Sequence, residues 1–237
     1  MESNGGTVLS SPSPKYEVLK EIGKGSFGKV YQIRRVADGK TLVWKEINYG
    51  KMSEREKQLL VSEVNILREL RHPNITRYYD RVIDKDNAKL YIVMEYCAGG
   101  DLAALIRKRK KQLRETGNDI QAYISEETAW RILSQLTLAL LECHMRKEGN
   151  KILHRDLKPG NVFFDADQNV KLGDFGLSRV MGDESVFAYT HVGTPYYMSP
   201  EQIQEQRYNE KSDIWSAGCV IYEMLALRAP FEATNQI

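Results

Sequence analysis

One eight-residue string carries side chains that together could transfer a phosphoryl group. The string HRDLKPGN occupies residues 154–161. Its Asp156 carboxylate can accept the proton of an attacking hydroxyl, which is the task of a general base. Its Lys158 ammonium can neutralise charge on the γ-phosphate. The string therefore predicts a catalytic loop in which Asp156 and Lys158 are the catalytic residues.

Two further residues are of the types that bind a hard cation. Asn161 ends the string, and Asp174 begins the tripeptide Asp-Phe-Gly at residues 174–176. Mg²⁺ takes oxygen ligands and is commonly held by one or two side chains together with substrate phosphates. The tripeptide alone is no signal, but it follows a catalytic string. We therefore predict Mg²⁺ as a cofactor, with Asn161 and Asp174 as its ligands.

A glycine-rich string near the start of the chain could cover phosphates, because glycine lets a backbone approach them closely. The dinucleotide-binding form of this pattern needs a helix directly after the glycines. Here residues 30–36 have the pattern of a strand, so a hairpin folded over phosphates fits better. An ordinary tight hairpin stays an alternative for the string alone. Its candidate phosphate-covering residues are Ile22, Gly23, Lys24, Gly25, Ser26, Phe27, Gly28, Lys29 and Val30.

A lysine follows at the end of the apolar string LVWK, residues 42–45. Lys45 could bind the α- and β-phosphates if a carboxylate held it, and Glu63 on a predicted helix could supply that carboxylate. A lone lysine is more often a surface residue. The position of Lys45 after the glycine string favours the catalytic interpretation.

The first third of the sequence has the alternation and turn signals of a sheet. Asp38-Gly39 is typical of a hairpin between strands. A helix is predicted from Ser53, which with Glu56 resembles a capping box, to a point before Pro73. Its residues Leu60, Val64 and Leu67 would share one apolar face. The predicted antiparallel strands are 16–22, 30–36, 41–47, 77–84 and 89–95.

After Gly99-Gly100 the pattern becomes mainly helical. Ser125 can cap a helix, and the uncharged segment Ile214–Tyr222 suits a helix buried on all sides. Short strands are predicted at 151–153, 162–164 and 170–172. The residues predicted to share one face of the helix after Ser125 are Trp130, Leu133, Thr137, Leu140, Leu141 and His144.

Composition excludes several classes of protein. The 237 residues are 42% hydrophobic and 28% charged, which excludes a disordered or fibrous chain. The net charge of +2 gives no global attraction to nucleic acid or membrane, and we expect neither as a partner. Three separated cysteines form no zinc or disulfide pattern, as in a reducing compartment. Residues 1–15 are predicted to be a disordered arm, and the basic run 107–114 is predicted to be a solvated helix end or loop.

Taken in order, these strings resemble those of eukaryotic protein kinases, over residues 16–237. Lys158 and the string GTPYY at 193–197 resemble the serine/threonine type. The segments LVWKEINYGKMS, HPNITRYYD, LYIVMEYCAGGDL, GTPYYMSPEQ and YNEKSDIWSAGC further resemble the NIMA-related (never-in-mitosis) kinases, closest to their mitotic centrosomal branch. The resemblance implies an α+β, bilobal protein-kinase-like fold, with a five-stranded antiparallel sheet and one helix in the N-lobe and a mainly helical C-lobe.

The resemblance also implies roles for residues that pattern alone did not select. Val30 and Val43 would form the adenine roof, Phe163 the floor, and Met94 the gatekeeper. Glu95, Tyr96 and Cys97 would be the hinge that bonds adenine. Lys45 would pair with Glu63. Leu67, His154 and Phe175 would stack in the regulatory spine, and Asp213 would hold the catalytic loop.

Regulation is implied by the segment between residues 177 and 199. Arg155 precedes the catalytic aspartate, and in kinases so built this arginine often binds a phosphorylated activation loop. Thr190 occupies the position that this subfamily autophosphorylates, and it is expected to matter more than Ser185. Thr194 resembles the residue that contacts Asp156 and Lys158, so it is expected to be structural.

The expected domains are the arm (1–15) and a kinase domain (16–237) with N-lobe 16–94, hinge 95–99 and C-lobe 100–237. The family continues beyond the position of Ile237, so the C-lobe is expected to be incomplete and a buried Glu201 to lack its arginine partner. A catalytically impaired fragment or pseudokinase scaffold is therefore an alternative to an active kinase. A dinucleotide oxidoreductase is disfavoured by the strand after the glycines.

The resemblance implies ATP and protein substrates as partners, in the cytoplasm, the nucleus or at the centrosome. Without the coiled coil of the subfamily, these residues are expected to be monomeric.

Overall fold

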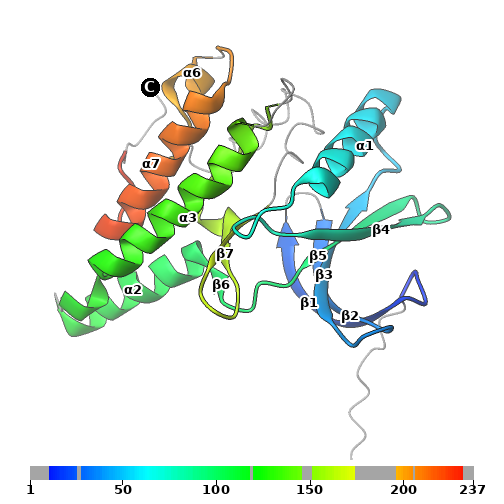
Figure 1. The fold of residues 1–237 in the computed structure, drawn as a ribbon, viewed down its shortest axis with the longest axis horizontal. Coiled ribbons are helices and arrows are strands. Elements are labelled where there is room, and N and C mark those ends of the chain that lie inside the picture. The colour runs from blue at the N-terminus through cyan, green and yellow to red at the C-terminus, as the bar shows by residue number, and fades with distance from the viewer. Residues whose placement is uncertain are drawn as a thin grey trace, which may run out of the picture. The chain divides into compact units, whose positions relative to one another are not determined.

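The computed structural model describes residues 11–25, 28–117, 120–145, 151–173, 196–204 and 206–231. The chain forms two compact units, which are described separately (Figure 1). The first contains the residues up to Lys57 and Arg77–Tyr96, and the second contains Gln58–Thr76 and the residues from Cys97 on. No helix in the described part of the chain is long and apolar enough to cross a membrane.

The first unit is built on the predicted five-stranded antiparallel sheet, in the order β1-β2-β3-β5-β4. The strands begin and end within a few residues of the predicted positions, the largest difference being at the end of β1. Their bounds are β1 Tyr16–Gly25, β2 Gly28–Arg35, β3 Thr41–Asn48, β4 Tyr78–Asp84 and β5 Lys89–Glu95.

The two faces of this sheet have different contents. One face carries a hydrophobic core cluster that includes Tyr16, Trp44 and Tyr91, with the Trp44 and Tyr91 ring centroids 4.9 Å apart. Side chains alternate between the faces along a strand. Val43 and Lys45, the neighbours of Trp44 on β3, therefore point to the opposite face.

Helix α1 spans Glu54–Glu69 and ends before Pro73, as predicted. Its N-terminus has the predicted capping box: the Ser53 N–H donates to Glu56 Oε2 (2.6 Å), and the Glu56 N–H donates to Ser53 Oγ (3.3 Å). The buried stripe consists of Leu60, Glu63, Val64 and Leu67. From Gln58 on, the helix is grouped with the second unit.

The second unit is mainly helical, and with the sheet of the first unit it confirms the α+β class. Its helix α7 packs against both α2 and α3, and β6, β7 and β8 form a small sheet (Figure 1). The elements are β6 Gly100–Asp101, α2 Leu102–Thr116, η1 Ile120–Ala122, α3 Glu126–His144, η2 Pro159–Asn161, β7 Val162–Phe164, β8 Val170–Leu172, α6 Pro200–Ile203 and α7 Glu210–Ala226.

Three local predictions for the second unit were wrong. Residues 151–153 form no strand. On α3, Trp130 and Leu141 are exposed, because the helix buries a neighbouring stripe that includes Ile132 and Leu136. Helix α7 is not buried on all sides, since Ile214 is 50% exposed. An uncharged run does not specify which of its faces is covered.

The basic run 107–114 lies on α2, and most of its side chains are exposed or half-buried, as predicted for a solvated helix. Lys110 differs from its neighbours, because its ammonium pairs with Glu223 of α7.

Candidate active site

The predicted catalytic residues of the second unit converge on one carboxylate. Lys158 Nζ lies 2.7 Å from Asp156 Oδ2, and Asn161 Nδ2 lies 3.2 Å from the same oxygen. Asn161 Nδ2 also donates to the Asp156 carbonyl oxygen at 2.6 Å. The turn η2 brings these side chains together, with Pro159 at its first position. Two donors thus orient the Asp156 carboxylate through its Oδ2, which suits a general base.

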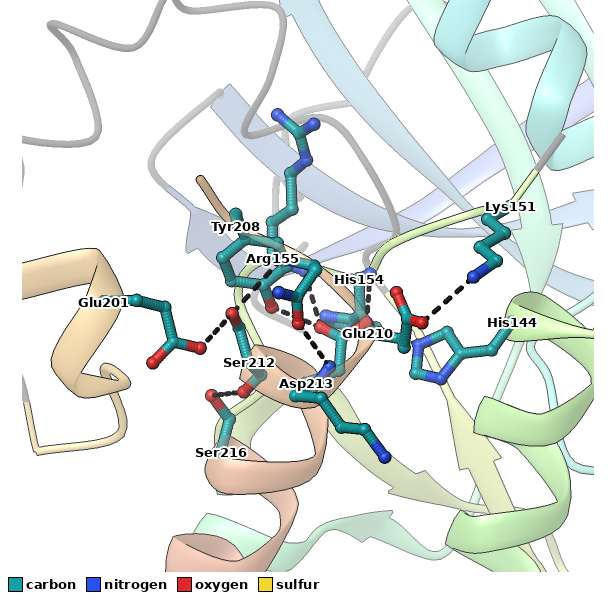
Figure 2. Close-up of polar contacts among 12 residues, drawn as sticks. His144, Lys151, His154, Arg155, Glu201, Tyr208, Glu210, Ser212, Asp213 and Ser216 are labelled. Carbon is teal, nitrogen blue, oxygen red and sulfur yellow. Dashed lines mark hydrogen bonds and ion pairs between the residues drawn. The ribbon is translucent and has the colours of Figure 1, made fainter. Parts of the chain in front are cut away.

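The loop that carries Asp156 is held by a buried aspartate on α7 (Figure 2). The two oxygens of Asp213 accept the backbone N–H groups of His154 (2.9 Å) and Arg155 (3.1 Å). Asp213 is fully buried. This is the anchoring role that the resemblance implied for Asp213, and it fixes the backbone immediately before Asp156.

Two side chains complete the shell around Asp213. His144 Nε2 lies 2.7 Å from Oδ2, and the Tyr208 hydroxyl donates to Oδ1. Burial by itself raises the pKa of Asp213, but the hydrogen bonds from His144, Tyr208 and the His154 N–H outweigh it and hold that pKa below its ordinary value. An ionised carboxylate only accepts, so the His144 Nε2 carries the proton.

The pKa of Tyr208 shifts in the opposite direction to that of Asp213. Burial, and then the negative charge of Asp213, raise the pKa of Tyr208, so its hydroxyl stays protonated and remains a donor. Its ring also lies 6.0 Å from the Arg155 guanidinium carbon.

The backbone of Arg155 has φ = 68°, in the left-handed region that a non-glycine residue rarely adopts. Such a conformation costs about 1–2 kcal/mol and persists only where the surroundings enforce it. Here the bond from the Arg155 N–H to Asp213 and the contact with Tyr208 do so. The strained residue lies directly before Asp156, where a fixed backbone is useful.

His154 is packed and hydrogen-bonded, as expected, and is not an exposed acid or base. It is fully buried, and its Nε2 donates to the Gly173 carbonyl at 2.8 Å. The Gly173 N–H in turn donates to the Asn161 carbonyl at 2.9 Å. The catalytic loop is therefore bonded twice to Gly173, the residue before Asp174.

The glycine string of the first unit forms a hairpin, and no helix follows it. Gly25 pairs with Gly28 across β1 and β2. Gly28 has φ = 147°, and a Cβ atom there would lie 2.1 Å from the Glu46 carbonyl oxygen. Only glycine fits this position. The strand β2, which begins at Gly28 where a helix would be needed, excludes the dinucleotide-binding form of the motif.

Four of the predicted ATP-contact residues share one face of this sheet. Val30 lies opposite Lys45, and Val43 lies opposite Met94. Residues directly opposite each other in an antiparallel pair point the same way, and this is the face away from the Trp44 cluster. Phe163, on β7 of the second unit, is half-buried.

The remaining predicted ATP-contact residues that the structure describes lie in the glycine hairpin and in the predicted hinge. Ile22, Lys24 and Lys29 are exposed, and Lys29 Nζ binds Glu21 Oε2 at 2.9 Å. The Glu95 N–H donates to the Arg77 carbonyl at 2.9 Å, and the Cys97 side chain is half-buried and forms no disulfide.

Lys45 and Glu63 are each buried, with 3% and 5% exposure. Lysine and glutamate are seldom buried without a partner. Their pairing stays a prediction.

Several predicted residues lie outside the described part of the chain. They are Ser26, Phe27, Asp174, Phe175, Ser185, Thr190 and Thr194. Their roles remain predictions.

The expectation of a buried Glu201 lacking its partner was wrong. Glu201 is half-buried, and its carboxylate accepts the hydroxyl of Ser212, the bond that holds its pKa below the ordinary value (Figure 2). Because the carboxylate is partly solvated and hydrogen-bonded, no penalty of an uncompensated buried charge arises here.

The residues that support the loop were mostly missed by sequence reasoning. His144 was assigned only to a helix face, and Tyr208 was not selected. His144 lies 69 positions from Asp213, so no local spacing signals their contact. Tyr208 lies only 5 positions from Asp213, but a lone tyrosine ahead of a helix is not a recognised signal for such a contact. The available signal was the loop-holding role that the resemblance implied for Asp213, since an aspartate that is buried in such a role requires donors around it.

One of the two predicted Mg²⁺ ligands, Asn161, lies among the described residues, and its surroundings suit that role. Both side-chain bonds of Asn161 use its Nδ2, which leaves the amide oxygen as the atom suited to a hard cation. The other predicted ligand, Asp174, is outside the described residues. Among the residues described, no group of three or more His, Cys, Asp or Glu side chains is arranged to hold a metal.

Comparison with known families matches residues 16–237 to the protein kinase domain. The chain is 59% identical over 229 residues to the serine/threonine-protein kinase Nek2 of Homo sapiens, covering 96% of this chain and 50% of that protein. It is 58% identical over 222 residues to the probable serine/threonine-protein kinase nek2 of Dictyostelium discoideum, covering 94% of this chain and 51% of the relative.

A third relative is the G2-specific protein kinase nimA of Emericella nidulans. It is 46% identical over an alignment of 253 residues, gaps included, that covers 97% of this chain and 35% of that protein. The chain therefore belongs to the protein kinase family. The resemblance to its NIMA-related serine/threonine branch is confirmed. The chain spans about half the length of the Nek2 relatives it matches.

Proposed function

We propose that this chain is the catalytic domain of a serine/threonine protein kinase that transfers the γ-phosphate of Mg·ATP to protein hydroxyls. The observation that carries the proposal is the Asp156 carboxylate, oriented by Lys158 and Asn161 on a loop held by Asp213. A pseudokinase has no need of this arrangement.

Each residue has a defined task in this reaction. Asp156 orients the substrate hydroxyl and accepts its proton, a contribution of about 10²–10⁴-fold in rate. Lys158 neutralises charge on the γ-phosphate, and Lys45, held by Glu63, binds the α- and β-phosphates. Asn161 and Asp174 hold Mg²⁺, which supplies the remaining neutralisation of the phosphates.

Adenine binds against Val30, Val43 and Phe163, beside Met94 and the backbone of Glu95 and Cys97. The glycine hairpin of residues 22–30 covers the phosphates. The alignment of Val30, Val43 and Lys45 on one sheet face supports this assignment.

Activation proceeds through the segment before residue 196. A phosphate on Thr190 adds about −1.5 to −2 units of charge, enough to order a loop by pairing with Arg155. The resemblance supports a structural role for Thr194, in which it would contact Asp156 and Lys158. The printed name of one relative, a G2-specific protein kinase, supports a role in control of the cell cycle. The proposed mitotic role and the intracellular location at the centrosome rest on the resemblance to the NIMA-related kinases.

The test is phosphate transfer from labelled ATP to three peptides that differ only in a Ser, Thr or Tyr acceptor. We expect transfer to Ser and Thr that is lost in EDTA and in Asp156→Asn. Equal transfer by Asp156→Asn and wild type, or transfer to Tyr alone, would contradict the proposal.

A further inference from the structure

A carboxylate near the end of α7 joins two elements that are far apart in sequence. Lys110 Nζ of α2 lies 2.9 Å from Glu223 Oε1, and the Tyr197 hydroxyl donates to Glu223 Oε2. The Glu223 side chain is 11% exposed and that of Lys110 is 33% exposed. Each oxygen of one largely buried carboxylate therefore has its own donor.

The two donors are of different kinds. Burial, followed by the hydrogen bond to Glu223, raises the pKa of Tyr197, so its hydroxyl remains protonated. Lys110 supplies the only full positive charge that the described residues place against Glu223. A buried carboxylate that loses its cation is strongly unfavourable and turns towards water or another donor. Lys110 thus keeps Oε2 directed at Tyr197.

Tyr197 is also held through its backbone. Ser216, on the same helix as Glu223, donates its hydroxyl to the Tyr197 carbonyl at 2.7 Å. The segment before α6 is therefore fixed to α7 at a main-chain and a side-chain point. Thr194, proposed to contact Asp156 and Lys158, is three residues upstream.

Lys110 stands apart from the rest of the basic run. Its neighbour Lys111 pairs with Glu115 one turn along the same helix, at 3.7 Å, and is 77% exposed. Such an exposed i,i+4 pair contributes little. Lys111 is therefore the matched control for Lys110.

We propose that Lys110 is a positioning residue for phosphotransfer: by holding the Glu223 carboxylate against Tyr197, it fixes the segment that directly follows Thr194, the residue proposed to contact Asp156 and Lys158. This assigns a task to one residue of the basic run, and it rests on the proposed kinase function. Lys110 acts through Glu223 and Tyr197 and touches neither ATP nor the reacting hydroxyl.

Steady-state kinetics distinguish positioning from general destabilisation. In Lys110→Met we expect kcat/KM for a peptide substrate to fall about tenfold, with KM for ATP unchanged. Lys110→Arg, which keeps the charge, should recover most of the loss, and Lys111→Met should equal wild type. An unchanged peptide kcat/KM, or equal losses in Lys110→Met and Lys111→Met, would overturn the proposal.

A second readout is independent of activity. Amide hydrogen exchange of the peptide covering residues 196–204 should be faster in Lys110→Met than in wild type, and unchanged in Lys111→Met. A peptide from the middle of α3 reports global stability, and the acceleration at residues 196–204 should exceed any change in exchange there. If Lys110→Met does not fold, the milder Lys110→Gln is compared in the same way.

Unchanged exchange at residues 196–204 in a folded Lys110 variant would refute the inference. If the wild-type chain transferred no phosphate, the kinase proposal would fail. The exchange measurement would still decide whether Lys110 holds this segment.

Discussion

Replacing Asp213 by asparagine tests how the catalytic loop is held. The substitution keeps the size and shape of the side chain but converts one carboxylate oxygen into an NH₂ group. Oδ2 accepts from the His154 N–H and from His144, and Oδ1 accepts from the Arg155 N–H and Tyr208. Whichever oxygen is replaced, two buried donors face another donor.

The magnitude follows from this count. A hydrogen bond to a charged group contributes about 1.5–3 kcal/mol, so losing two gives about 3–6 kcal/mol of destabilisation. That is a large part of a typical stability of about 5–15 kcal/mol. The same change frees the backbone before Asp156, and a displacement of about 1 Å in a catalytic group costs about 10²-fold in rate.

The assay is urea denaturation at pH 7 together with kcat. Glu210→Gln is the control, because Glu210 lies on the same helix and pairs with Lys151 at 3.0 Å, but in an exposed position (Figure 2). We expect a much smaller change in both quantities for the control. If Asp213→Asn matched Glu210→Gln in stability and in kcat, the anchoring argument would be refuted.

Three further predictions follow from the same residues. The pKa of Asp213 is lowered from its ordinary value of 3.8, so the stability that ionised Asp213 contributes is complete above that value and is lost as the pH falls below it. The unfolding free energies of wild type and Asp213→Asn should therefore converge on acidification, and a difference between them that grew at low pH would contradict this direction. Asp156→Asn should lower kcat by at least about 10²-fold with an unchanged thermal midpoint, which calorimetry and initial rates check; a retained kcat would remove Asp156 from the role of base. Thr190→Ala should lower activity more than Ser185→Ala in a peptide assay, and a Thr190→Ala rate equal to wild type would contradict the activation proposal.

The sheet was predictable because its signals are local. Alternation, the Asp38-Gly39 turn and the capping box at Ser53 each act within a few residues of the chain. The glycine hairpin followed from the same kind of evidence, since a strand pattern begins directly after Gly28. The register that places Val30 opposite Lys45 then follows from the hairpin between β2 and β3.

The covered faces of the helices were not predictable in the same way. Trp130 and Leu141 on α3 are exposed although they are apolar. Which stripe of a helix is buried depends on the helices packed against it, and a helix with apolar residues on several sides does not specify this.

The functional residues divide along the same line. Asp156, Lys158 and Asn161 lie within six consecutive residues, so their types and spacing were sufficient to predict that their side chains meet. His144 and Lys110 bind carboxylates 69 and 113 positions away, and lone His and Lys side chains have no pattern that reveals a distant carboxylate. Tyr208 is close to Asp213 in sequence, but a lone tyrosine has no pattern that reveals such a contact.

The most direct test of the central claim is the intact mass of the chain after incubation with Mg·ATP, measured in parallel for Asp156→Asn. The account predicts added phosphate on the wild-type chain, mapped by fragmentation to Thr190, with none on the variant or in EDTA. An unmodified wild-type chain that also failed to phosphorylate Ser and Thr peptides would contradict the account.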